Sequence, residues 1–326
     1  MPRRSRARSV VLTPLAVLAL LGPTACGDGA QPDAASPEEL TEVTVGIIPI
    51  IDVAPLYLGI EQGFFADRGI EVSTQQAQGG AAIVPAVVAG EYQFGFSNIV
   101  SMLIARDRGL PLDLVAIGAR ASEDVLDDGS GQMMATDASI GTVEDLVGRR
   151  VAINTLAGIT EVAVRASLDA QGVDADQVQF VEIAIPDMPS ALTGGQVDAA
   201  VMAEPFTTLA ARDGARPLPV SYAAMNAGAP FAGWFTTETQ AQEQPEVTQR
   251  FTEALEESLR YATDNPDEAR AALDEYLDLP DGIGEEVTLP GWDPTIDEDQ
   301  LRRLAELTAE YGFISSPDVL DDLLAG

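Results

Sequence analysis

The stretch that decides the fold is Val43-Thr-Val-Gly-Ile-Ile-Pro-Ile-Ile-Asp-Val-Ala-Pro-Leu-Tyr-Leu-Gly-Ile-Glu-Gln-Gly-Phe-Phe-Ala-Asp-Arg-Gly-Ile-Glu-Val72. Residues 43–48 form a short apolar run rich in β-branched side chains, which predicts a strand buried on both faces. Asp52 can cap the helix that follows, and Pro55 suits its first turn. Apolar side chains recur in that helix every four residues, so one stripe is expected to pack on the sheet. Residues 70–72 begin a second strand.

Two strands joined through such a helix run parallel, and sheets of this kind bind ligands beyond the carboxyl ends of their strands. Here the first strand ends at the loop 50–53, which contains Ile51 and Asp52. We therefore expect this loop to line a binding site.

The same alternation of strands and helices continues along the chain and predicts an α/β fold. Strands are expected at 43–48, 70–72, 93–96, 112–118, 151–153, 178–183 and 199–202, with a further apolar run around Val220. Helices are expected at 81–89, 99–108, 159–171, 188–192, 205–212, 245–263 and 300–310.

An internal echo indicates two similar lobes. Residues 85–96 and 189–201 each read as a helix, a Gly stop and a buried strand. Each lobe is expected to hold a mixed, mostly parallel sheet flanked by helices, with the helices of the last third packed around the first lobe.

Composition excludes several classes of chemistry. The formal net charge is −34, the sequence has no His, and its eighteen basic residues are all Arg. A His metal site, a Ser-His-Asp triad, a phosphate-loop Lys and a Schiff-base Lys are therefore excluded. Nucleic acid is not expected as a partner because its phosphate backbone would be repelled.

The N-terminus predicts export. Residues 1–25 combine an Arg-rich start with an apolar segment of about a dozen residues, which is typical of a signal peptide and too short to span a bilayer. Thr24-Ala25-Cys26 resembles the end of a bacterial lipobox, although Pro23 departs from the usual Leu. Cys26 is the only Cys and is predicted to carry a lipid anchor, with 26–42 as a flexible tether.

The chain resembles the solute-binding proteins of ABC importers in the nitrate, taurine and alkanesulfonate class, which includes thiamine-pyrimidine-like members. Residues 54–72 fit the class pattern A-P-x-Y-x-A/G-x-E-x-G-F-F-x-x-x-G-I-x-V, and Gly195 to Phe206 fit G-x-V-D-A-A-x-x-x-E-P-F/W. The resemblance covers residues 43–325. It implies a type II periplasmic-binding-protein fold with two interlobe crossings.

The same resemblance implies a function. The protein would act, as a monomer without a cofactor or metal, in the periplasm or on the outer face of the cell membrane. It would close on a small anionic, nitrate-, sulfonate- or taurine-like ligand and deliver it to an ABC permease and its ATPase, without being an enzyme. Crossings are expected near 115–121 and 217–222. The predicted lobes are 43–118 with 221–326, and 119–220.

Candidate ligand-binding residues lie at the expected strand ends and helix starts. They are Ile51, Asp52, Gln78, Gly79, Gly80, Ser97 and Asn98 in the first lobe, and Thr155, Ala157, Gly158, Ile159, Thr160, Asp187 and Glu204 in the second. Glycines at helix starts leave backbone N–H groups open to an anionic oxygen. Each residue taken singly also suits a turn or a cap.

Four further assignments each have an alternative. Arg120 can grip an anionic group with two N–H donors, or form a surface ion pair with Glu123 or Asp124. Trp234 can stack on an organic ligand, but core packing is the favoured role. Asp52 and Glu204 can each hold an amino group or cap the next helix; capping is favoured for Asp52 and a cleft-facing role for Glu204.

Two other functions stay open at this point. One is an exported enzyme of the same fold, similar to pyrimidine-precursor synthases, although that chemistry uses His and a cofactor-bearing Lys, which this sequence lacks. The other is a ligand-sensing partner of a membrane receptor.

Overall fold

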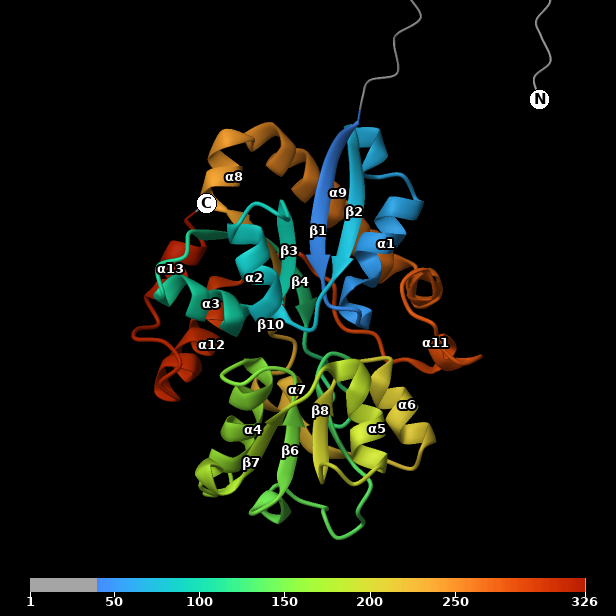
Figure 1. Cartoon of the computed structure of the whole chain (residues 1–326), viewed down its shortest axis with the longest axis vertical. Helices are drawn as coiled ribbons and strands as arrows, with labels where there is room; N and C mark the ends of the chain where they lie inside the picture. Colours follow the sequence, from blue (N-terminus) through green and yellow to red (C-terminus); the bar gives the residue numbers. More distant parts are fainter. Residues whose placement is uncertain (1–39, 326) are drawn as a thin grey trace, which may run out of the picture. The chain divides into compact units, whose positions relative to one another are not determined.

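The structure is a computed structural model and describes residues 40–325. Its first sheet has the strand order β2-β1-β3-β10-β4 (Figure 1). The strands are β1 (Thr41–Ile47), β2 (Ile70–Gln76), β3 (Phe94–Asn98), β4 (Leu112–Arg120) and β10 (Pro230–Thr237). β1 runs parallel to β2 and β3, as expected, whereas β10 is antiparallel to β3 and β4.

The second sheet repeats this arrangement with the order β7-β6-β8-β5-β9. Its strands are β5 (Gln132–Ala135), β6 (Arg150–Ile153), β7 (Gln179–Glu182), β8 (Ala199–Met202) and β9 (Arg216–Ser221). β5 is antiparallel to β8 and β9, so both sheets are mixed and carry the antiparallel strand at the same position. The two copies of the echo form α2–β3 and α5–β8, which occupy equivalent places in the two sheets.

Helices cover the faces of both sheets. They are α1 (Ala54–Glu61), α2 (Gly80–Val88), α3 (Ile99–Asp107), α4 (Ile159–Asp169), α5 (Met188–Thr193), α6 (Phe206–Arg212), α7 (Tyr222–Met225), α8 (Glu238–Glu243), α9 (Pro245–Asp264), α10 (Pro266–Ala271), α11 (Ile283–Glu286), α12 (Glu298–Glu310) and α13 (Val319–Leu323). The orange and red helices α8, α9, α12 and α13 in Figure 1 pack on elements of the first sheet, as expected. No helix in the described part is long and apolar enough to cross a membrane.

The core of the first sheet is aromatic. Phe251 of α9 is fully buried and stacks on Phe94 of β3, with ring centroids 3.8 Å apart. Phe65 lies 5.5 Å from Phe251 on the same side. α9 also approaches α1 closely, because a Cβ at Gly59 would lie 1.8 Å from Oγ of Ser258. These contacts fix α1, and with it the loop that precedes α1, against the sheet.

The chain passes between the sheets twice, at residues 121–131 and 222–229. The crossings expected near 115–121 and 217–222 therefore fall largely on the ends of β4 and β9, just before the connecting segments. The division into lobes at 118/119 and 220/221 stays a prediction. The sequence also did not indicate β5 or β10; β5 has only four residues, and β10 begins at Pro230 and contains Gly233, two residue types that are rare in strands.

Candidate functional site

The carboxyl ends of strands from the two sheets meet in one place. Three hydrogen bonds join them: Ile51 N–H to the Glu204 carbonyl oxygen at 2.9 Å, Ser130 Oγ to Asp52 Oδ1 at 2.8 Å, and Asn154 Nδ2 to the Gln78 carbonyl oxygen at 2.7 Å. We call the region between these strand ends the interlobe cleft; it is bounded by 48–53, 76–80 and 97–98 on one side and by 130–131, 154–160, 184–187 and 203–204 on the other. Most of the sequence-predicted site residues lie here.

A hollow of about 280 Å³ opens at one edge of the cleft. Gln78 and Asp187, both predicted site residues, lie on opposite sides of it. The other lining residues are Ile48, Pro49, Gln76, Ala77, Ala184 and Pro186. The walls thus come from the ends of β1, β2 and β7, as expected for a binding site at strand ends.

Asp52 is the most unusual residue of the cleft. Its side chain is 0% exposed, Oδ1 accepts the hydrogen bond from Ser130, and Oδ2 has no hydrogen-bond partner in the described structure. Burial raises the pKa of Asp52 to about 7; the Ser130 hydrogen bond opposes this rise, and the nearby Asp128 carboxylate adds to it. The favoured role as a helix cap is wrong, because Asp52 lies inside a short 3₁₀ turn, 51–53, and α1 has no side-chain cap.

Ser97 is a second buried residue with an unsatisfied polar atom. Its side chain is fully buried at the end of β3, and Oγ has no partner among the described atoms. A Cβ at Gly80 would lie 1.8 Å from that Oγ, so Ser97 points at the first residue of α2. α2 has neither a side-chain cap nor an acid in its first turn. The start of α2 therefore offers hydrogen-bond donors. The neighbouring Asn98 instead caps α3, because its Oδ1 accepts a hydrogen bond from Ser101 N–H at 2.9 Å.

The loop 154–160 of the second sheet is less open to an anion. Ala157 has a φ of 53°, and its N–H donates to Oε2 of Glu161 at 2.8 Å. The Glu161 carboxylate therefore already lies at the positive end of α4. This weakens the prediction that the N–H groups at Ala157, Gly158 and Ile159 bind an anionic oxygen of the ligand. The hydroxyl of Thr155 bonds to Asn154 at 3.1 Å, and Thr160 is buried in the first turn of α4.

Glu204 caps a helix. Oε2 accepts from Thr208 N–H at 3.1 Å, and Oε1 accepts from Thr208 Oγ1 at 2.8 Å and from Thr288 N–H at 3.3 Å. Burial raises the pKa of this carboxyl, and these hydrogen bonds partly offset the rise. The favoured cleft-facing role is thus not supported: the backbone of Glu204 reaches the cleft through Ile51, but its carboxylate holds the start of α6.

Arg120 and Trp234 also serve the structure. The Arg120 guanidinium donates to the carbonyl oxygens of Asp293, Gly228 and Thr295 and to Oε1 of Gln300, so neither a ligand grip nor the expected ion pair is seen. Trp234 is 0% exposed and packs on Phe96, with ring centroids 5.0 Å apart, which agrees with the favoured core role. No described Arg side chain donates a hydrogen bond to the cleft loops at 48–53, 76–80, 97–98, 154–160 or 184–187.

We expect an Arg120→Ala variant to lose about 1–3 kcal/mol of the free energy of unfolding, because the half-buried Gly228 carbonyl oxygen and Gln300 Oε1 lose a charged donor. Its ligand affinity should stay within about threefold of wild type. Urea unfolding and calorimetric titration of the two proteins would measure both values. A drop in ligand affinity of tenfold or more, without a drop in the free energy of unfolding, would indicate that Arg120 contacts the ligand.

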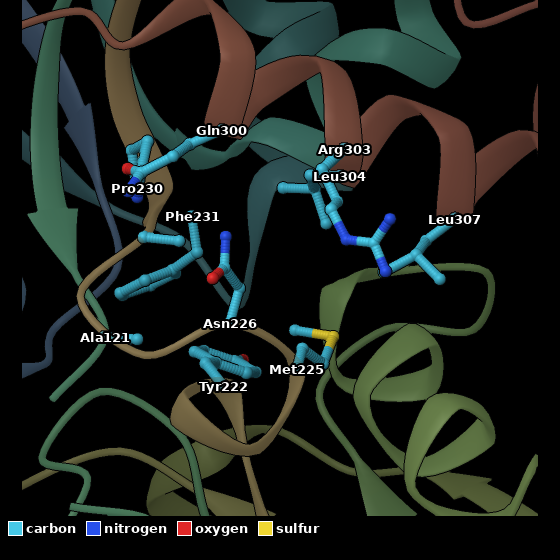
Figure 2. Close-up of a pocket in the computed structure, with 11 residues that line it drawn as sticks. Ala121, Tyr222, Met225, Asn226, Pro230, Phe231, Gln300, Arg303, Leu304 and Leu307 are labelled. Atoms are coloured by element: carbon cyan, nitrogen blue, oxygen red, sulfur yellow. The ribbon is translucent and has the colours of Figure 1, made fainter. Parts of the chain in front are cut away.

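Figure 2 shows a small cavity, of about 20 Å³, where the two passages between the sheets meet. Tyr222 and Phe231 lie on one side of it, and Arg303 and Leu304 reach in from α12. Tyr222 is buried, and its pKa is raised mainly by burial and also by Asp52 and Asp128. The phenol is therefore neutral and can act as a hydrogen-bond donor close to the cleft.

Sequence reasoning missed several contributors to the cleft. They are Ser130, Asn154, Tyr222 and Tyr276, whose hydroxyl donates to the Ile50 carbonyl oxygen at 2.9 Å. Asn154 directly follows an expected strand, so the strand-end rule could have found it. For the other three, no pattern in the sequence indicated a place in the cleft. Among the described residues, no group of His, Cys, Asp and Glu is placed to hold a metal ion.

Comparison with known proteins bears on the family and the fold. A model of the NMT1/THI5-like family matches residues 50–269. The taurine-binding periplasmic protein of Escherichia coli strain K12 is 24% identical over 205 residues, which cover 63% of this chain and 61% of that protein. The match thus spans less than two thirds of that relative's own length.

Two solved structures show the same fold. The alkanesulfonate-binding protein of Xanthomonas axonopodis pv. citri, solved with MOPS, has a TM-score of 0.71 and 16% identity; the alignment covers 89% of this chain and 99% of that one. The nitrate-binding protein of Synechocystis PCC 6803 has a TM-score of 0.71 and 14% identity, with 88% and 86% covered. The two-lobed periplasmic-binding-protein fold predicted from the sequence is confirmed, with both sheets mixed.

Proposed function

Because this chain belongs to the NMT1/THI5-like family, we propose that it is the extracytoplasmic solute-binding protein of an ABC importer. It captures a small ligand in the interlobe cleft by hinge closure and delivers it to a permease and its ATPase. The observation that carries this proposal is the meeting of two equivalent sheets at their strand ends, joined by the Ile51–Glu204, Asp52–Ser130 and Gln78–Asn154 hydrogen bonds. A ligand that contacts both sides stabilises the closed form by its differential affinity.

The ligand in this proposal is small and carries an anionic group, as nitrate, sulfonates and taurine do. The start of α2 supports this assignment, because open N–H groups at Gly79-Gly80 and the buried hydroxyl of Ser97 gather donors where no acid lies in the first turn. The overall charge of −34 repels anions, so local donors must supply the attraction. Gln78 and Asp187 at the mouth, and Thr155 and Thr160 at α4, complete the proposed site.

A thermal-shift screen tests the proposal. The panel contains nitrate, alkanesulfonates, amino-sulfonates, carboxylates and vitamin precursors, and we expect one class to raise the melting temperature in a concentration-dependent way. A panel in which no compound shifts melting would count against a solute-binding role. Turnover of a hit to a new compound would instead favour the exported-enzyme alternative, and a sensor kinase gene beside this one would favour the receptor-partner alternative.

We also propose that the protein is exported, held at the outer face of the membrane through Cys26, and monomeric. Cys26, the predicted signal peptide and residues 26–39 of the predicted tether lie outside the described residues, so the support is the sequence alone. The end of the predicted tether is wrong, because Thr41 and Glu42 belong to β1. Cys26→Ala should move the protein from the membrane fraction to the medium or soluble envelope fraction. A Cys26→Ala protein that stays on membranes after signal cleavage would contradict the anchor.

A further inference from the structure

A segment of the C-terminal third reaches from the first sheet to the second without belonging to either passage. We call residues 276–291, which include α11, the strap. At one end of the strap, Tyr276 Oη donates a hydrogen bond to the Ile50 carbonyl oxygen, in the loop after β1, at 2.9 Å. At the other end, Gly291 forms an isolated β-bridge with Arg120 of β4. Both ends of the strap are therefore fixed to the first lobe.

The middle of the strap contacts α6, which packs on the second sheet. Figure 1 shows α11 of the strap beside α6. Arg212, the last residue of α6, donates two hydrogen bonds to the Glu286 carboxylate, from Nε to Oε2 at 3.1 Å and from Nη2 to Oε1 at 2.9 Å. Its Nη1 donates a third to the Asp281 carbonyl oxygen at 3.2 Å. A guanidinium that binds a carboxylate through two donors is a directional and comparatively strong contact.

Thr288 makes a second contact between the strap and the second lobe. Its N–H donates to Oε1 of Glu204 at 3.3 Å, and its hydroxyl donates to Oδ1 of Asp127 at 2.6 Å. A Cβ at Gly129 would lie 2.2 Å from the Thr288 carbonyl oxygen, so the two backbones lie in close contact. The Glu204 carbonyl oxygen also accepts the hydrogen bond of Ile51 N–H across the cleft. The strap and the cleft loop after β1 thus bind the same residue of the second lobe.

We propose that the strap stabilises the closed form of the protein before any ligand binds, through the Arg212–Glu286 ion pair and the contacts of Thr288. The ends of the strap move with the first lobe, so a rotation of the lobes about the two passages changes the distance between the strap and α6. This inference rests on the proposed hinge closure and adds a determinant of its equilibrium. Ligand affinity then depends on the strap, because less of the binding free energy is used to close the lobes.

Pulsed electron paramagnetic resonance of the ligand-free protein tests the inference. In a Cys26→Ala background, spin labels are attached at Val88→Cys, at the end of α2, and at Val147→Cys, just before β6. Both positions are exposed and lie outside the strap and its contacts. The distribution of distances between the labels gives the ratio of closed to open molecules, and the separation in the present structure identifies the closed form. The protein with native strap residues should show a closed population without ligand.

Exchanging the charges of the ion pair gives the decisive variants. Arg212→Glu should lower the closed-to-open ratio about tenfold, because an attractive pair becomes a repulsive one. Glu286→Arg should lower the ratio by a similar factor. The double variant, which reverses the pair, should return the ratio to within about threefold of its original value. Arg260→Ala is the matched control, since it removes an exposed ion pair with Glu256 that lies wholly within α9, and it should leave the ratio unchanged.

Three results would overturn the inference. They are a ratio that neither single variant changes, a loss that the reversed pair does not recover, and the absence of a closed population in the protein with native strap residues. The measurement contains no ligand, so its outcome is separate from that of the thermal-shift screen. A ligand found by the screen together with any of these results leaves the solute-binding function standing and removes the role of the strap. The expected ratios together with an empty screen confirm the strap and count against solute binding alone.

Discussion

A Phe251→Ala variant is expected to lose about 3–5 kcal/mol of the free energy of unfolding. Phe251 is 0% exposed, stacks on Phe94 at 3.8 Å and packs against Phe65 at 5.5 Å, so truncation removes a large buried ring and leaves a cavity between α9 and the first sheet. Urea unfolding at neutral pH measures the loss.

Val247→Ala is the matched control, because Val247 lies one turn earlier on the same stripe of α9 and is only half-buried. It should cost about 1 kcal/mol or less. Similar losses in the two variants would contradict the packing described for α9. A Phe251→Leu variant, which refills part of the cavity, should recover part of the loss.

The second large effect concerns Asp52 and pH. Between pH 4.5 and pH 7, wild type should lose about 2–4 kcal/mol of stability relative to an Asp52→Asn variant. The carboxyl has a pKa of about 7 in the folded protein against the ordinary 3.8, so over this range the folded state binds the extra proton. Stability therefore falls as pH rises from 4 towards 7 and levels off above 7.

Urea unfolding of both proteins at a series of pH values gives the difference directly. Other buried acids such as Asp128, Glu204 and Asp113, whose pKa values are also raised, contribute to both proteins and largely cancel. Asp278→Asn, at an exposed position, should follow the wild-type curve. Parallel curves of stability against pH for wild type and Asp52→Asn would mean that Asp52 is hydrated in solution. That result would contradict the description of Asp52 as a buried, unpaired carboxylate.

The fold was largely predictable because its signals are local. The run 43–48, the apolar stripe of α1 and the echo at 85–96 and 189–201 each follow from the periodicity of a single element. β10 was not predicted because its pairing partners, β3 and β4, are more than a hundred residues away in sequence, and because it begins at Pro230 and contains Gly233, which are rare in strands. The insertion of β10 as an antiparallel strand depends on tertiary contacts, which the local sequence pattern does not predict.

The site was predictable in position but less so in role. The strand-end rule placed Ile51, Gln78, Ser97 and the loop 154–160 at the cleft, yet Arg120, Glu204 and Asn98 turned out to bind carbonyl groups or helix starts. Whether a polar side chain faces the cleft or a neighbouring backbone group depends on rotamers and on distant loops. For Arg120, the decisive partners lie at Asp293, Thr295 and Gln300, which no spacing near residue 120 reveals.

The central claim, capture by cleft closure, is tested most directly by cross-linking across the cleft. Asn154 contacts the backbone of Gln78 from the opposite side at 2.7 Å, and Cys26 is the only native Cys. In a Cys26→Ala background, Gln78→Cys and Asn154→Cys should form a disulfide in the closed form. We predict that a saturating hit from the screen accelerates disulfide formation at least severalfold. An unchanged rate with a ligand whose binding calorimetry confirms would contradict closure.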